Sequence, residues 1–393
     1  MTRTSVAIFT DNDFEKVNGV TTALSAVLDH APDDVDVRVY TAAALGVDSP
    51  DYLALESWGV GIPFYPEMRM YWPPYRRMLD RLAQDGVDVI HVTTPGPVGL
   101  AALAAARRLR LPLVGSFHTD LAEYTVRLSG SAALGAFMRH YMTWLYGRCE
   151  RVLVPSRATV DLVVRAGLSP DHVAIWGRGV DTSHFEPARR SVDWRRRWRA
   201  PADRPVLLYV GRVSPEKGVD LLPDLHDELM RRGLNHRLVV VGDGPARETL
   251  ARRCPDAMCL GTLGRQDLAD VYASADLFVF PSRTDTAGNV VLEAQASGLP
   301  VLVSDAGGPR EQMQPDVSGL VCGPTLAPWV EAAASLLTDR PRRLAMAAAA
   351  RRYAESRHWA HALAPLFDTY RTAASGRRTS LAARGATGRP QVA

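Results

Sequence analysis

Residues 277–304 read LFVFPSRTDTAGNVVLEAQASGLPVLVS. Two short apolar runs, 277–281 and 301–304, stand on either side of a stretch rich in alanine, valine and leucine. A brief and almost wholly apolar run predicts a strand buried on both faces of a parallel sheet. The stretch between the runs predicts a helix. This strand-helix-strand unit indicates an α/β fold with a parallel sheet.

The same alternation runs along most of the chain. Strands are expected at 5–10, 37–40, 87–93, 113–118, 151–155 and 173–177, and then at 206–210, 237–242, 258–260, 277–281 and 301–304. The charged, proline-containing stretch 189–205 interrupts the pattern and is expected to link two domains. We therefore expect two doubly wound Rossmann-like domains, 1–190 and 200–355, with ligands bound at the carboxyl ends of the strands in a cleft between the domains. A helix near 358–372 is expected to pack back on the first domain, and 375–393 to form a disordered basic tail.

Composition excludes several classes of protein. The 393 residues carry 46 basic and 43 acidic side chains, a formal charge of +3, which is too little excess for a dedicated nucleic-acid binder. No apolar stretch approaches the ~18 residues of a spanning helix, and the first apolar run is too short for a signal peptide. The four cysteines form no CxxC pair, so a metal centre or disulfide scaffold is not expected. These features predict a cytoplasmic protein with reduced cysteines.

A candidate phosphate site follows the strand expected at 206–210. Residues 211–218 read GRVSPEKG, and they place Arg212 and Lys217 just after a glycine turn. Lys217 and Lys16 are the only two lysines of the chain. Fixed cations beside a helix start suit a diphosphate, whereas the alternative is an ordinary solvated loop. The spacing of a Walker loop is absent, which disfavours a kinase or ATPase.

A second candidate site follows the strand expected at 277–281. The loop 285–289 opens a helix whose free N–H groups can bind an anion or sugar hydroxyls. For Asp285, the spacing alone favours a helix cap. Glu293 lies inside the apolar helix VVLEAQASG, where an unpaired carboxylate is costly. It therefore needs a polar partner, and the vicinal hydroxyls of a ribose suit this role.

The first domain offers weaker signals. Gly19 stands where the first helix is expected to start and could let a phosphate approach the backbone, although a plain turn is the favoured explanation of an isolated glycine. A lone histidine is usually structural, but His118 ends an expected strand, and this position also suits a hydrogen-bonding role at the reaction centre. His91 lies within an expected strand, and a core or supporting role is favoured for it.

Together these segments resemble the retaining glycosyltransferases of family 4, which have the GT-B fold of two facing Rossmann-like domains. The resemblance extends to about Tyr370 and rests on an ordered set of motifs, which is far more specific than any one of them. They are VNGV at 17–20, GSFHTD at 115–120, WGRGVDTSHFEP at 176–187, GRVSPEKG at 211–218, VGDGP at 241–245 and SRTDTAGNVVLEAQASGLPV at 282–301.

The resemblance implies a nucleotide diphosphate sugar, GDP- or UDP-linked, as co-substrate, with no cofactor and no metal required. By it, Arg212 and Lys217 hold the diphosphate, Gly19 lets it approach the first domain, and Glu293 binds the ribose. His118 contacts the transferred sugar or the acceptor, and Asp285 with the amides of Thr286, Ala287, Gly288 and Asn289 binds sugar hydroxyls. Val290 extends this donor set, and base recognition runs through the backbone around Leu263. The resemblance also implies transfer by front-face displacement, in which the leaving diphosphate helps to deprotonate the acceptor.

Two positions depart from the family pattern. The first acid of the signature is commonly glutamate and is Asp285 here, and a position that is commonly aromatic or leucine is Ala287. Both changes touch the sugar pocket, so they can alter which hexose is taken or, if the geometry shifts, cripple transfer.

The acceptor is expected to be a lipid-linked molecule or a glycan. The subgroup with VNGV and WGRGVD includes enzymes that mannosylate or glucosylate lipids. Residues 66–77, PEMRMYWPPYRR, combine Tyr71, Trp72 and Tyr75 with three arginines, a mixture that suits an anionic membrane surface. The alternative is a loop that packs its aromatic side chains internally. If the segment binds lipid, the protein is peripheral on the inner face of the plasma membrane.

Three other functions compete with a hexosyltransferase. A sugar-nucleotide epimerase or hydrolase on the same fold, and a catalytically silent binding protein, remain open, while a dinucleotide oxidoreductase is disfavoured because no GxGxxG follows the first strand. The sequence does not fix the base, the hexose, the acceptor or the oligomeric state. Replacing Lys217 or Glu293 with alanine is expected to impair donor binding or turnover strongly, and replacing Lys16 to matter less.

Overall fold

The computed structural model describes residues 3–12, 19–42, 51–62 and 65–387, and the chain divides into two compact units. Unit 1 comprises Met1–Gly177 and Leu363–Ala393, and unit 2 comprises Arg178–Ala362. The division therefore falls before the stretch 189–205 that was expected to link the domains. That stretch instead belongs to unit 2, where it forms helix α7 (Val192–Arg197) and buries Trp198 completely.

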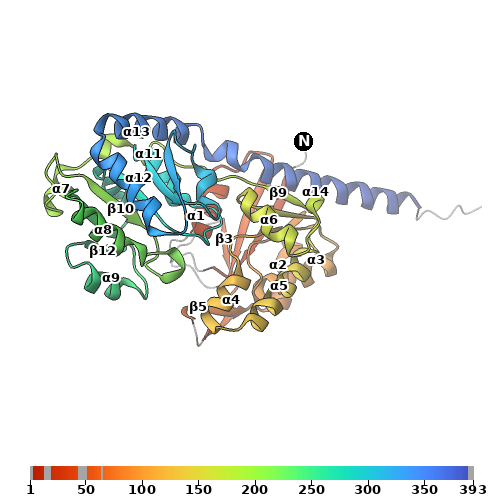
Figure 1. Cartoon of the computed structure of the whole chain (residues 1–393). Coiled ribbons are helices and arrows are strands. Elements are labelled where there is room, and N and C mark those ends of the chain that lie inside the picture. The colour runs from red at the N-terminus through yellow and green to blue at the C-terminus, as the bar shows by residue number, and fades with distance from the viewer. Residues whose placement is uncertain (1–2, 13–18, 43–50, 63–64, 388–393) are drawn as a thin grey trace, which may run out of the picture. The chain divides into compact units, whose positions relative to one another are not determined.

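Unit 1 is built on a parallel sheet, coloured from red to yellow-green in Figure 1. In sheet order its strands are β3 (Tyr52–Ala54), β2 (Val35–Thr41), β1 (Thr4–Thr10), β6 (Val89–Val92), β7 (Leu113–Ser116), β8 (Arg151–Val154) and β9 (Val173–Ile175). The chain order reverses between β1 and β6, as it does at the ligand-binding edge of doubly wound folds. The sequence predicts all of these strands except β3. Strand β7 ends at Ser116, which places His118 in the loop beyond it.

The helices of unit 1 connect these parallel strands. They are α1 (Gly19–Asp29), α2 (Tyr75–Gln84), α3 (Pro97–Leu109), α4 (Leu121–Ser129), α5 (Ala132–Tyr146) and α6 (Arg157–Arg165). The last helix, α14 (Trp359–Thr387), belongs to unit 1 from Leu363 onward. Its Arg371 makes two hydrogen bonds of 2.8 and 2.9 Å to the Asp34 carboxylate. The helix continues to Thr387, whereas the sequence analysis expected disorder from 375.

A β-hairpin occupies the segment that the sequence analysis treated as a loop. Strands β4 (Trp58–Ile62) and β5 (Tyr65–Trp72) pair in antiparallel fashion, with Trp58 opposite Trp72. Within the predicted membrane-binding segment 66–77, Tyr71 is buried while Trp72 and Tyr75 are exposed. The segment thus divides between the two alternatives, because one aromatic ring packs inward and two face outward.

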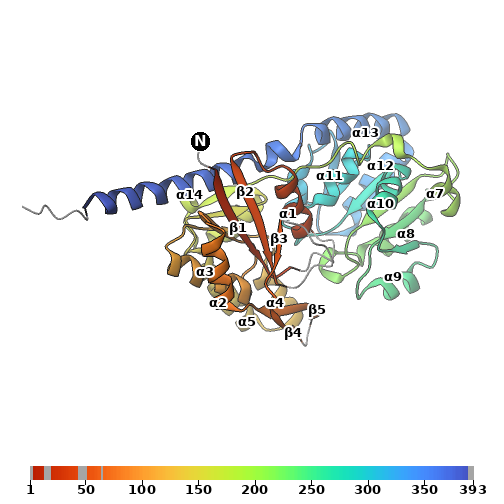
Figure 2. The same ribbon diagram turned by 180° about the vertical axis from the view of Figure 1, so that it is seen from behind.

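Unit 2 is a second parallel sheet, which Figure 2 shows from behind, in green to blue. Its strands in sheet order are β12 (Met258–Gly261), β11 (Arg237–Val241), β10 (Val206–Val210), β13 (Leu277–Phe280), β14 (Val301–Ser304) and β15 (Gly319–Cys322). Its helices are α7, α8 (Leu221–Arg231), α9 (Arg247–Arg253), α10 (Arg265–Ser274), α11 (Asn289–Ala296), α12 (Leu326–Thr338) and α13 (Arg340–Glu355). Strand β15 is the one member of this described sheet that the sequence analysis did not anticipate.

The loops at the carboxyl end of this second sheet pack backbone against backbone. Gly242 has a φ of +125°, and a Cβ atom there would lie 1.9 Å from the Gly211 carbonyl oxygen. A Cβ atom on Gly308 would lie 2.1 Å from the Thr286 oxygen. Glycine is therefore required at both positions, because any side chain would force the loops apart. These contacts hold the loops after β10, β11, β13 and β14 together around the reversal point between β10 and β13.

Candidate active site

The reversal point of the second sheet brings two predicted site residues into contact. Lys217 ends a short 3-10 turn in the loop after β10, and Asp285 lies in the loop after β13. Lys217 Nζ donates a 2.6 Å hydrogen bond to Asp285 Oδ2, and the two side chains are 22% and 21% exposed. A lysine ammonium has three donors, so this pair leaves two of them for a ligand.

Asp285 organises the loop that leads into α11. Its Oδ1 accepts hydrogen bonds from the Gly288 N–H at 3.1 Å and the Ala287 N–H at 3.4 Å, and its carbonyl accepts one from Gly308 at 2.8 Å. Burial alone would raise the pKa of Asp285, but the Lys217 charge and these hydrogen bonds outweigh burial and lower it. The carboxylate is therefore ionised and holds the turn before α11, but it does not cap the helix, whose N-cap residue is Gly288.

Arg212 stands at the start of the loop after β10, partly buried. Its carbonyl oxygen accepts a 2.7 Å hydrogen bond from the Tyr209 hydroxyl, which fixes the loop against the strand. Burial lowers the pKa of the Arg212 guanidinium, while the charge of Glu216 opposes this shift. A partly dehydrated guanidinium interacts strongly with an anion that can displace the remaining water.

The first turn of α11 offers further polar groups. Gly288 precedes the helix with a φ of +76°, and Thr286, Ala287 and Val290 are each partly buried beside it. Both polar atoms of the Asn289 side chain are buried and, within the described residues, make no hydrogen bond. Such groups are rare in folded proteins unless a ligand or water satisfies them. The amide of Asn289 is therefore available to a ligand at this helix start.

Glu293 lies one turn further along α11. Its Oε2 accepts a 2.9 Å hydrogen bond from the Tyr272 hydroxyl on α10. Burial raises the pKa of Glu293, and the Tyr272 hydrogen bond and the charge of Arg265 offset only part of the shift. Tyr272 is thus one of the polar partners that the sequence predicts for the Glu293 carboxylate. Leu263, in the loop after β12, is partly buried against the core of unit 2.

Arg178, for which the sequence predicts no role, is 1% exposed. Burial lowers the pKa of Arg178 to about 10, and the charge of Asp285 acts against that shift, which places the guanidinium within electrostatic range of the carboxylate. The signal was present in the motif WGRGVD, where an arginine stands between two glycines. Asp285 therefore lies in the field of two cations, Lys217 and Arg178.

In unit 1, His118 is partly buried just beyond the carboxyl end of β7. The Ser116 hydroxyl lies 2.9 Å from His118 Nε2, and the Trp176 ring meets the imidazole edge to face at 5.6 Å. Gly19 is the first residue of α1 and is exposed. The residues before it, including Lys16, lie outside the described part of the chain.

Comparison with known proteins decides the family. Residues 17–184 match the model of "Glycosyltransferase Family 4", and residues 191–353 match that of "Glycosyl transferases group 1". A "GDP-mannose-dependent alpha-mannosyltransferase" of Mycobacterium tuberculosis is 35% identical over 96% of this chain and 99% of its own length. The chain belongs to the family 4 glycosyltransferases. This confirms the resemblance drawn from the motifs.

Further relatives extend the match. A protein of the same name in Corynebacterium glutamicum is 32% identical over 90% of this chain and 85% of its own length. Among solved structures, Anabaena HepE in complex with UDP-glucose superposes with a TM-score of 0.75 at 18% identity, covering 94% of this chain and 99% of that one. The family 4 glycosyltransferase described here therefore has the GT-B fold, as expected, and is a hexosyltransferase that uses a nucleotide sugar.

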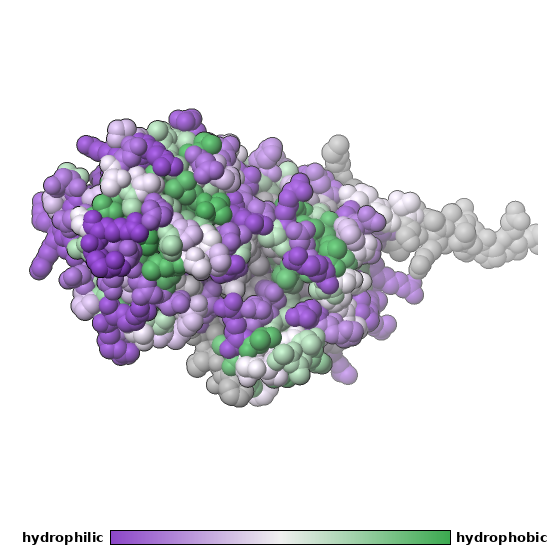
Figure 3. Space-filling model, in the orientation of Figure 1, coloured by the Kyte–Doolittle hydropathy of each residue, from purple (hydrophilic) through white to green (hydrophobic). Residues whose placement is uncertain are grey.

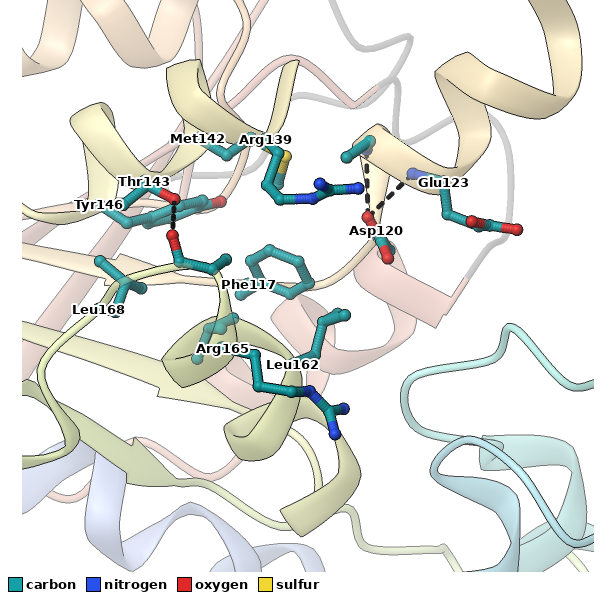
Figure 4. A pocket seen from close by; sticks show the side chains of 13 residues that line it. Phe117, Asp120, Glu123, Arg139, Met142, Thr143, Tyr146, Leu162, Arg165 and Leu168 are labelled. Carbon is teal, nitrogen blue, oxygen red and sulfur yellow. Dashed lines mark hydrogen bonds between the residues drawn. The ribbon is translucent and has the colours of Figure 1, made fainter. Parts of the chain in front are cut away.

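A cavity of about 320 Å³ opens between α4, α5 and α6 of this glycosyltransferase (Figure 4). Phe117 and Asp120, on either side of His118 in the sequence, both line it. Its apolar wall includes Met142, Leu162 and Leu168, and its charged groups are Asp120, Glu123, Arg139 and Arg165. The cavity thus combines an apolar interior with charged groups, next to the segment that carries His118.

Exposed apolar side chains gather on the same unit. Those on the β4–β5 hairpin are Trp58, Val60, Met70 and Trp72, and those on helices α4 and α5 are Leu128, Leu134, Phe137 and Trp144. Helices α4 and α5 lie side by side in Figures 1 and 2. Figure 3 shows hydrophobic surface at this lower edge. We call this set the apolar rim. Along the described chain, no helix has the length and apolarity needed to cross a membrane.

Proposed function

We propose that this enzyme transfers a mannosyl group from GDP-mannose, with retention of anomeric configuration, to a lipid-linked acceptor at the cytoplasmic face of the plasma membrane. The observation that carries the proposal is the Lys217–Asp285 pair at the reversal point of the second sheet, beside the start of α11. The near full-length similarity to GDP-mannose-dependent enzymes supports mannose as the hexose and guanine as the base.

The chemistry follows from the charges at this point. When the glycosidic bond breaks, negative charge develops on the leaving diphosphate, and preorganised cations and N–H groups stabilise it. Lys217, Arg212 and the first turn of α11 supply such groups without a divalent metal. We assign the sugar hydroxyls to Asp285 and the amides of the loop that it holds, with Asn289 beside them. Ribose binding is assigned to Glu293, and base contacts to the backbone around Leu263.

A donor assay tests the proposal directly. The purified enzyme is incubated with GDP-mannose, UDP-glucose or GDP-glucose, in the presence of EDTA, with and without a membrane lipid extract. Acceptor-dependent release of GDP and an α-linked lipid product, identified by NMR, are expected from GDP-mannose. Turnover of UDP-glucose instead would reassign the donor. A β-linked product, or hydrolysis or epimerisation of the sugar nucleotide without acceptor, would contradict the proposed transfer.

The cavity beside His118 is our candidate for the acceptor site. An amphipathic acceptor needs apolar contacts for its lipid part and polar contacts for its head group, and the cavity offers both kinds of side chain. His118, proposed to contact the reacting sugars, lies between two of the residues that line it.

Filling the cavity is expected to weaken binding of the acceptor and to leave binding of the donor nucleotide unchanged. Ala166→Leu adds bulk to the cavity wall, and the KM for the lipid acceptor should rise about tenfold, as if two methylene groups lost their burial. The dissociation constant of GDP should not change. Ala104→Leu, the same change on the exposed side of α3, serves as the matched control. An unchanged acceptor KM in Ala166→Leu would rule out the cavity as the acceptor site.

The apolar rim is our candidate for the membrane contact. Trp58 is 69% exposed and its ring lies 5.5 Å from that of Trp72, a pair that suits the interface of a bilayer. Exposed arginines at 69, 76 and 77 stand close by in the sequence and favour an anionic surface. The predicted segment 66–77 therefore contributes through its exposed residues, and helices α4 and α5 enlarge the surface.

Vesicle flotation measures this contact. The protein should float with vesicles that contain anionic phospholipid and much less with neutral ones, and added salt should weaken the binding. Replacing both Trp58 and Trp72 with serine should lower the floating fraction by about half or more, because the apolar contact is lost. Val192→Ser, which removes a 73% exposed apolar side chain from unit 2, is the control. Equal flotation of all three proteins would exclude the apolar rim as the membrane contact.

A further inference from the structure

A chain of hydrogen bonds runs from helix α14 to His118 through the interior of unit 1. The Tyr370 hydroxyl lies 2.6 Å from His91 Nδ1, and His91 Nε2 lies 2.9 Å from the Ser116 hydroxyl. The same hydroxyl lies 2.9 Å from His118 Nε2. Tyr370, His91 and Ser116 are each 0% exposed. The three buried groups therefore connect His118 to a residue 279 positions beyond His91 in the sequence.

Two members of the buried part, His91 and Tyr370, have fixed protonation. Burial lowers the pKa of His91 to about 3, so its ring is neutral and carries one proton. Burial raises the pKa of Tyr370 well above its ordinary value, so its hydroxyl keeps its proton. A neutral imidazole has one donor nitrogen and one acceptor nitrogen. The remaining variable is the direction in which the hydrogen bonds run.

Only one direction satisfies every buried group. Within the described residues His91 is the sole hydrogen-bond partner of the Tyr370 hydroxyl, so this hydroxyl must donate to Nδ1 or leave its proton unpaired. An unpaired buried donor costs about 1–3 kcal/mol. With Nδ1 accepting, His91 carries its proton on Nε2 and donates to Ser116. The serine hydroxyl then donates its own proton to His118 Nε2.

We propose that Tyr370, His91 and Ser116 are positioning residues that hold His118 as the neutral tautomer with its proton on Nδ1. This inference deepens the proposed function, since it rests on a role for His118 beside the reacting sugars. His118 then offers its surroundings a hydrogen-bond donor at Nδ1. Protonation of Nε2 would leave one buried proton without an acceptor, because a serine hydroxyl has one proton to donate and two lone pairs to accept. The unpaired proton is that of Ser116 if His91 keeps its tautomer, and that of Tyr370 if the chain reverses, so the chain opposes the imidazolium form.

The neighbouring titratable groups do not reverse this direction. Tyr146 on α5 donates to the Ser116 carbonyl at 3.0 Å and leaves the serine hydroxyl unaffected. Asp120 accepts from the N–H groups of Ala122 and Glu123, so its charge is engaged at the start of α4. The Trp176 ring packs against both imidazoles, 6.4 Å from His91 and 5.6 Å from His118, and carries no charge.

Tyr370→Phe tests the proposal because it removes one hydroxyl and little volume. Without the tyrosine hydroxyl, Nδ1 of His91 has no hydrogen-bond partner among the described residues in either tautomer, so neither tautomer is preferred. The chain can then reverse, and Ser116 can accept a hydrogen bond from a protonated His118. The acidic limb of the pH–rate profile should move up by about 0.5–1 pH unit, and kcat should fall several-fold with the donor KM unchanged. Tyr40→Phe is the matched control, since Tyr40 is equally buried in unit 1 but donates to Asp85.

Nitrogen NMR of histidine-labelled protein reads the tautomer without any substrate. The His118 signal, assigned with His118→Gln, should show a proton on Nδ1 in the unaltered protein and in Tyr40→Phe, and a mixture of tautomers in Tyr370→Phe. A proton on Nε2 in the unaltered protein, or the same tautomer in all three, would overturn the proposal. A changed tautomer with an unchanged pH profile would support the chain and instead overturn the role of His118 in the proposed transfer.

Discussion

Replacing Lys217 with alanine is expected to lower kcat/KM for sugar transfer about 100-fold or more, the loss typical when one preorganised charge is removed from a developing anion. Two effects act together in this variant. The diphosphate loses a cation, and Asp285 loses the partner that its Oδ2 contacts at 2.6 Å. An ionised Asp285 without Lys217 would then repel the diphosphate. Initial rates of nucleotide release, measured across donor concentrations, give the change.

A double-mutant cycle separates the two effects. Asp285→Asn keeps the shape of the side chain and removes its charge, so combining it with Lys217→Ala should cost less than the sum of the two single changes in free energy. Lys217→Arg should restore only part of the activity, because a planar guanidinium does not reproduce a compact ammonium. Arg252→Ala, which removes an exposed cation on α9, is the control for net charge. Additive losses, or a Lys217→Ala enzyme as active as the control, would show that the pair does not act on the donor.

The sequence indicates individual residues of the proposed donor site, but not how they are arranged. Lys217 is conspicuous in the sequence because the chain has only two lysines, and Glu293 because it is an acid within an apolar helix. The contact between Lys217 and Asp285 spans 68 positions and arises because β10 and β13 are neighbours in the sheet. Strand order is set by packing of the whole domain, so no local pattern reports it.

Three other features could not be predicted from the sequence, each for a physical reason. The β4–β5 hairpin carries glycine, proline and arginine in place of a regular alternation, so the period of a strand is weak there. Helix α14 continues past Tyr370 through alanine and arginine, which favour helix, but serine, threonine and glycine interrupt them and no apolar stripe is formed. Arg178 stands out in the motif WGRGVD, but the motif does not indicate that the side chain is buried, because arginine is almost never fully buried unless it is paired.

Replacing Glu293 with glutamine is expected to weaken GDP binding about tenfold or more, because hydrogen bonds to a charged group contribute about 1.5–3 kcal/mol each. The carboxylate already accepts one hydrogen bond from Tyr272 at 2.9 Å, and it has remaining acceptor capacity for the two ribose hydroxyls. Glutamine preserves the size of the side chain but replaces one acceptor oxygen with a donor. Titration calorimetry with GDP measures the loss, and thermal unfolding checks that the variant is folded.

A thermodynamic cycle that compares GDP with 2′-deoxy-GDP in the unaltered enzyme and in Glu293→Gln tests whether Glu293 binds the ribose. In the unaltered enzyme, 2′-deoxy-GDP should bind about tenfold more weakly than GDP, because one hydroxyl no longer reaches the carboxylate. In Glu293→Gln, 2′-deoxy-GDP and GDP should bind with nearly equal affinity. Tyr272→Phe removes the protein's own hydrogen bond to Glu293 and should leave the preference for the 2′-hydroxyl intact. If 2′-deoxy-GDP loses equal affinity in all three proteins, Glu293 is a structural carboxylate that Tyr272 satisfies, and the ribose binds elsewhere.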